Sequence, residues 1–129
     1  MDSTKREYLG WTYEEIAEHI IEIVDVAIRD VAGPANSWLT ISPEDQRLFR
    51  EAFAFDGHGT AACLRIRGRS FVEVEVDISR GRGEVKASHW SGASDDPTAI
   101  ADRALALNAA AVVMTRIGLC LETLDTEEV

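Results

Sequence analysis

The segment whose residue types most resemble a catalytic loop is Asp56-Gly57-His58-Gly59-Thr60. A histidine between two glycines has an accessible imidazole and a backbone that lets a ligand approach closely. Asp56 could orient that imidazole, so Asp56 and His58 form a candidate ligand loop. A glycine-rich link between a helix and a strand has the same composition, and no nucleophile accompanies the loop. We therefore predict no catalytic residues, and keep a small enzyme or ligand-binding protein as an alternative.

A metal site needs three or four ligands that converge. His19 is expected at the border of the first helix and His89 on the core side of the third strand, so both are expected to be partly buried histidines with structural partners. No two histidines have the i, i+4 spacing that places ligands on one helix face. We expect no metal and no cofactor. The groups considered are His19, His58, His89, Asp56, Asp95 and Asp96.

Other catalytic and redox patterns are missing from the sequence. There is no GxSxG nucleophile elbow, and the glycines of Gly81-Arg82-Gly83 link two expected strands instead of leading into a phosphate-binding helix. Cys63 and Cys120 are far apart and form no CxxC pair. Two isolated thiols are typical of a reducing compartment. The N-terminus has no apolar signal core, so we expect a cytoplasmic protein.

The charge is strongly negative and unevenly distributed. The formal net charge is −10, which argues against direct binding to nucleic acid or to anionic membranes, since both require positive charge. Residues 14–30 hold six acidic groups against the single base Arg29, and residues 122–129 hold four acidic groups and no base. Acidity is therefore concentrated in one helix and in the C-terminal segment.

Within the first helix the acidic groups form a stripe. Glu14, Glu18 and Glu22 follow one another at i, i+4, and Asp25 lies on the same helical face. Like charges at this spacing cost roughly 0.2–0.5 kcal/mol per pair. Such a stripe either keeps a protein soluble or meets a basic partner. We select these four residues as the candidate partner-binding site.

The first helix has clear local start and stop signals. Thr12 is the expected N-cap, and Glu15 three residues later completes a capping box. Gly33-Pro34 is the expected end. The apolar positions share one broad face: Ile16, Ile20, Ile21, Ile23, Val24, Ala27, Ile28 and Val31.

A second, shorter helix is expected from Ser42 as N-cap, with Pro43 at its first position. Three strands follow, near residues 62–67, 72–78 and 84–90, because apolar and polar residues alternate there. The short glycine-containing turns between them predict an antiparallel meander. The apolar stripe of the second helix is expected to be Leu48, Phe49, Ala52 and Phe53.

The charges suggest a register for this meander. We predict Arg65 opposite Glu73 and Asp77 opposite Lys86, because both choices keep apolar residues on one face and oppose unlike charges on the other. One sheet face is then core, and the other carries ion pairs.

The last helix is expected to begin at Asp96-Pro97 and to end at Gly118. From Ile100 to Ile117 it is apolar on almost every side, and such a helix is normally covered on every side. A three-stranded sheet can cover only one side, so we predict a homodimer through this helix. No segment is judged long and apolar enough to cross a membrane.

These patterns predict one α+β domain over residues 1–129, with two layers in the order α-α-β-β-β-α, a three-stranded antiparallel meander and helices on one sheet face. Residues 1–10 are expected to be an N-terminal arm and 122–129 a flexible acidic tail. The expected function is non-catalytic binding of a basic protein, as an inhibitor, immunity-type or host-modulating factor. The other alternative is a self-associating assembly subunit or adaptor.

Overall fold

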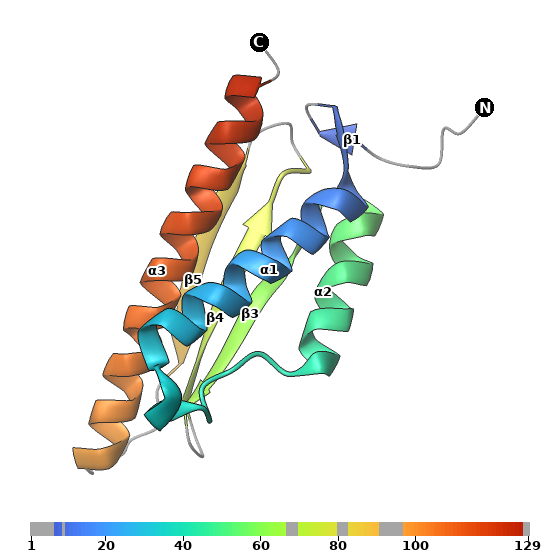
Figure 1. Cartoon of the computed structure of the whole chain (residues 1–129). Helices are drawn as coiled ribbons and strands as arrows, with labels where there is room; N and C mark the ends of the chain where they lie inside the picture. The colour runs from blue at the N-terminus through green and yellow to red at the C-terminus, as the bar shows by residue number, and fades with distance from the viewer. Residues whose placement is uncertain (1–6, 9, 67–69, 80–82, 91–96, 128–129) are drawn as a thin grey trace.

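The computed structural model describes residues 7–8, 10–66, 70–79, 83–90 and 97–127. Within these ranges the chain forms a small two-stranded hairpin, three α-helices and a three-stranded antiparallel sheet (Figure 1). The elements are β1 (Glu7–Tyr8), β2 (Trp11–Thr12), α1 (Tyr13–Ala32), a 3₁₀ turn (Pro34–Asn36), α2 (Pro43–Asp56), β3 (His58–Ile66), β4 (Ser70–Asp77), β5 (Glu84–Trp90) and α3 (Pro97–Glu127).

The helices pack on one face of the sheet, whose strand order is β3-β4-β5 (Figure 1). On the central strand β4, the valines at 72, 74 and 76 are fully buried, whereas Glu73, Glu75 and Asp77 on the opposite face are half-buried. α1 lies between α3 and α2 across the sheet (Figure 1). The predicted α+β class, the order α-α-β-β-β-α and the single helical layer are confirmed.

The ends of α1 follow the local signals. The Thr12 Oγ1 atom accepts a hydrogen bond from the Glu15 backbone N–H at 3.1 Å, and the Glu15 carboxylate accepts one from the Thr12 N–H at 2.9 Å. This capping box satisfies two of the donors that a helix start leaves open. At the other end Gly33 has φ +69°, and its N–H donates to the Arg29 carbonyl.

α2 also begins as predicted, because the Ser42 hydroxyl accepts from the Asp45 N–H at 3.1 Å and Pro43 is its first residue. Its buried face is narrower than the predicted stripe. Phe49 and Phe53 are buried, but Leu48 is 49% exposed and Ala52 is also exposed. The helix lies at the edge of the helical layer, and among the described residues it packs mainly against α1 and β3, on its inner side.

α3 does not end at Gly118, and that prediction is wrong. The helix continues to Glu127, so the acidic segment 122–127 is part of it. Ile117 and Leu121 are buried on either side of the glycine. A glycine inside a helix costs about 1 kcal/mol relative to alanine, whereas burying one Ile or Leu side chain contributes roughly 1.5–3 kcal/mol. The burial outweighs the local penalty.

The strand registers differ from the prediction by two residues. Cys63 lies opposite Glu73, and Arg65 lies opposite Phe71; in the second hairpin Glu75 lies opposite Lys86, and Asp77 opposite Glu84. A shift of two residues keeps every side chain on its predicted face, so the core face was correct although the charge pairs were not.

We expected no segment long and apolar enough to cross a membrane, but α3 meets both criteria. Its stretch Pro97–Thr123 is long and apolar enough by those two criteria. In the structure it packs against α1 and all three strands of the main sheet. Core helices of soluble domains often meet the same criteria, so this feature alone does not indicate a membrane location.

Candidate functional site

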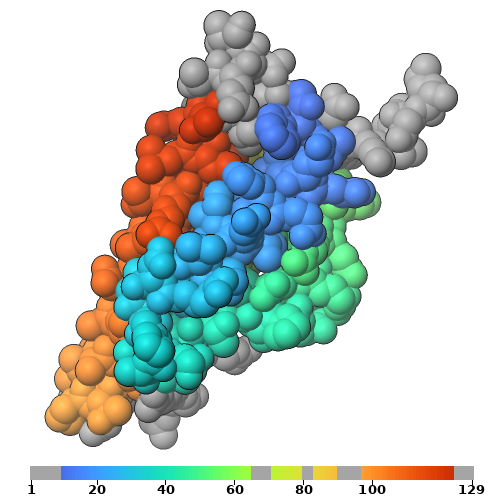
Figure 2. Space-filling view, viewed as in Figure 1, coloured from blue at the N-terminus to red at the C-terminus, as the bar shows by residue number. Residues whose placement is uncertain are grey.

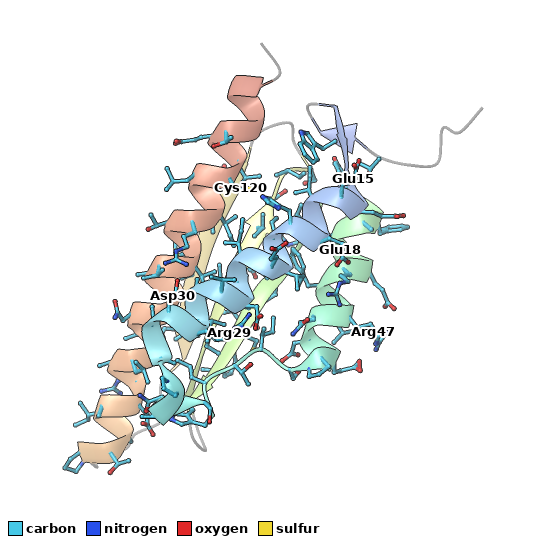
Figure 3. All side chains as sticks on the ribbon, in the orientation of Figure 1. Glu15, Glu18, Arg29, Asp30, Arg47 and Cys120 are labelled. Carbon is cyan, nitrogen blue, oxygen red and sulfur yellow. The ribbon has the colours of Figure 1, made fainter. Side chains whose placement is uncertain are left out.

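The predicted acidic stripe lies on the outward side of α1. Glu14, Glu18 and Glu22 are exposed, and Asp25 is half-buried. Figure 3 shows Glu15 and Glu18 on the N-terminal half of α1, near α2, whereas Asp30 lies near α3. Thus the acidic groups of α1 divide between its two neighbouring helices.

A groove of about 450 Å³ separates α1 from α2. Three of the four predicted residues line it, and Glu14 does not. The groove adds Glu15, which sequence reasoning had assigned only to the capping box. Its lining comprises Trp11, Glu15, Glu18, His19, Ile21, Glu22, Asp25, Gln46 and Arg50.

Two of the predicted carboxylates already have a cationic neighbour. The Arg50 Nε atom lies 2.6 Å from Glu18 Oε2, which links α2 to α1 across the groove. Within α1, an Arg29 Nη2 atom lies 2.5 Å from Asp25 Oδ2. All four side chains are more than a third exposed, so these ion pairs are surface pairs worth roughly 0–1 kcal/mol each. The groove itself has four carboxylates and one guanidinium among its lining residues.

The acidic residues of α2 are arranged differently. Arg47 is hydrogen-bonded to Glu44 and to Glu51, the latter at 2.7 Å. The hydrogen bond to Glu44, followed by that to Glu51, raises the pKa of the Arg47 guanidinium above its ordinary value. One base therefore compensates two acids on α2, while the stripe on α1 keeps an excess of negative charge.

The Asp56–His58 loop is shorter than predicted, and its parts have other roles. Asp56 ends α2, and its carboxylate accepts from the His58 backbone N–H at 3.0 Å instead of contacting the imidazole. His58 begins β3, and its Nδ1 atom lies 3.5 Å from Asp77 Oδ2. The imidazole therefore faces a carboxylate of β4, and the prediction that Asp56 orients it is not what the structure shows.

The two glycines of this loop are needed for packing. Gly57 has φ +75°, and a Cβ atom there would lie 2.8 Å from Cε2 of Tyr13. A Cβ atom at Gly59 would lie 3.0 Å from the ring of Phe49. Close approach of aromatic rings accounts for both glycines without a ligand.

In the part of the chain that the structure describes, the histidines form no metal site with the acidic groups. His19, His58 and His89 are exposed and lie on α1, β3 and β5, so the expectation that His19 and His89 are partly buried is wrong. Among the residues that the structure describes, no group of three or more His, Cys, Asp or Glu side chains could hold a metal ion. Asp95 and Asp96 lie outside the described residues.

The sequence matches no protein-family model, and no significant match is found among curated proteins or solved structures. Function is therefore inferred from geometry and charge alone.

Proposed function

We propose that this chain is a small non-catalytic binding protein, of the inhibitor, immunity or host-modulating type, which engages a basic protein through the acidic face of α1. The observation that carries the proposal is the groove between α1 and α2, which Glu15, Glu18, Glu22 and Asp25 line together with one guanidinium, that of Arg50, which pairs with Glu18. Elsewhere, Arg47 compensates two acids of its own helix.

The groove suits a long cationic side chain. Its volume of about 450 Å³ exceeds what one arginine or lysine side chain needs, and the acidic groups are accompanied by Trp11 and Ile21. Lysine and arginine side chains place their methylene stems on apolar surface while their charged heads remain in a polar environment. Trp11 is 36% exposed and offers such a surface, as well as a ring face for a guanidinium.

The existing ion pairs leave the carboxylates available to a partner. A surface pair contributes at most about 1 kcal/mol, so a partner's arginine can replace Arg50 beside Glu18 at little cost. Excess negative charge on one face also accelerates the encounter with a basic protein. Because surface charges are screened beyond about 8 Å at physiological salt, binding should weaken as salt rises.

A comparison of two variants with equal charge tests the proposal. In the first variant, the four stripe residues Glu14, Glu18, Glu22 and Asp25 become Gln or Asn. In the matched control, four exposed carboxylates away from α1 become Gln or Asn: Glu44, Glu51, Asp56 and Glu84. Labelled polylysine should lose affinity mainly for the stripe variant. An equal loss in both variants would mean that only net charge matters, which contradicts the proposal.

A further inference from the structure

α3 has a second face that the rest of the described chain does not cover. Ile100, Leu107 and Leu119 on it are 45%, 41% and 57% exposed. Between them Ala104 and Ala111 are also exposed. Successive steps of four, three, four and eight residues place all five on one side of the helix. In Figures 1 and 2, α3 forms one long side of the molecule.

The orientation of this face is fixed by the opposite side of α3. Ala109, Val113 and Ile117 are buried towards the sheet and α1. Arg116 Nη1 lies 2.8 Å from Asp30 Oδ2 on α1. This ion pair fixes the rotation of α3 about its own axis relative to α1. Only 39% of the most apolar 18-residue stretch of α3 is buried, so much of this apolar helix faces outwards.

The residues of this face have a size pattern that is symmetric along the helix. About a point between Ala109 and Ala110, Ile100 mirrors Leu119 and Ala104 mirrors Thr115. Leu107 mirrors Val112 in the same way, so large residues lie at the ends and near the centre, with small ones between them. A two-fold interface pairs one patch with itself, so it requires such self-complementarity. We propose that this face binds the same face of a second copy of the chain, as an antiparallel pair of α3 helices.

Charge complementarity favours this antiparallel arrangement. Glu122 is exposed at the C-terminal end of the same face. In the antiparallel pair it lies opposite Pro97 of the partner, at the positive end of that helix's dipole, where a carboxylate is stabilised. A parallel pair instead brings Glu122 against its own copy. A bilayer is a poorer occupant, because it would have to accommodate Asn108, Thr115 and Glu122.

β5 supplies additional surface next to α3. Ala87 and His89 lie opposite Val74 and Val72 of β4, which are fully buried, yet both β5 residues are exposed. The helical layer therefore stops short of this part of the sheet, although α3 packs against β5. Residues 100–122 span only about 33 Å of helix. A standard interface needs about 800 Å² from each partner, and the open part of β5 adds to the helix face.

The test uses the full chain and two charged variants at mirrored positions, Ala104→Glu and Thr115→Lys. Mass is measured by sedimentation equilibrium at about 100 µM of protein. This concentration is far above the micromolar dissociation constants of the weakest standard-size interfaces. The wild type should give twice the monomer mass of 14.2 kDa, and each variant alone should give the monomer. An equimolar mixture should recover the dimer, because the introduced carboxylate of one chain then faces the introduced ammonium of the other.

Circular dichroism verifies that both variants stay folded, and Ala52→Glu on the exposed side of α2 is the control that should remain dimeric. A wild-type monomer overturns the proposal, as does a dimer that Ala104→Glu leaves intact. Failure of the mixture to recover the dimer overturns the antiparallel register. A monomeric wild type that sediments with phosphatidylcholine vesicles, while Ala104→Glu does not, identifies a membrane as the occupant instead.

Discussion

Arg50 of α2 reaches across the groove to Glu18 of α1, with 2.6 Å between Nε and Oε2. This ion pair joins two helices that lie side by side on the sheet, and it occupies the centre of the acidic stripe. The proposal that the stripe binds a basic partner implies that Arg50 occupies the position of a partner's cation. It should then compete with binding while adding little to stability.

Replacing Arg50 with glutamine tests this competition. Polylysine should bind Arg50→Gln more tightly, because Glu18 loses its internal cation. The free energy of unfolding should fall by no more than about 1 kcal/mol, since both side chains are more than a third exposed. Fluorescence anisotropy measures the first effect and urea denaturation the second. Weaker polylysine binding by the variant would show that Arg50 holds Glu18 in its binding position and does not compete for it.

The core at the α2 end of the molecule depends on Phe53. Its ring is fully buried and lies 5.1 Å from that of Phe49 and 5.9 Å from that of Tyr13, between centroids. Phe53→Ala should lower the free energy of unfolding by about 3–5 kcal/mol. Phe55→Ala, two residues away and 75% exposed, should change it by less than about 0.5 kcal/mol. Similar urea midpoints for both variants would contradict this account of the core.

Two glycine substitutions should have effects of opposite sign. Gly57→Ala introduces a Cβ atom 2.8 Å from Tyr13 at φ +75°, so it should destabilise by more than about 1 kcal/mol. Gly118→Ala meets nothing within 4 Å in the middle of α3 and should stabilise by about 0.5–1 kcal/mol. Thermal unfolding is measured in chains that also carry Ala104→Glu, which separates folding from the proposed dimer. A stabilising Gly57→Ala would refute the packing role of that glycine.

Signals within a few residues were sufficient to predict where α1 and α2 begin. Thr12 and Ser42 are side-chain caps, and a cap depends only on the next three residues. The alternation of β4 likewise identified its core face. It could not identify the register, because a shift by two residues leaves the same side chains on the same face.

Features that depend on distant contacts could not be read from the sequence. Gly118 has the composition of a helix stop, but the burial of Ile117 and Leu121 carries α3 past it. The partner of Glu18 comes from a helix 32 residues further along the chain, and no local pattern reports that helix packing. The groove therefore became visible only in three dimensions, although three of the stripe residues that line it were evident from residue spacing.

The most direct test of the central claim is affinity capture from native lysate at low and at moderate salt, with wild type, the stripe variant and its charge-matched control as baits. The account predicts one basic protein in stoichiometric amount with the wild type and the control, lost as salt rises, and absent with the stripe variant. A basic protein that the stripe variant retains as well as the wild type, or a captured partner that is indifferent to salt, would contradict the assignment of the acidic face of α1 as the binding site.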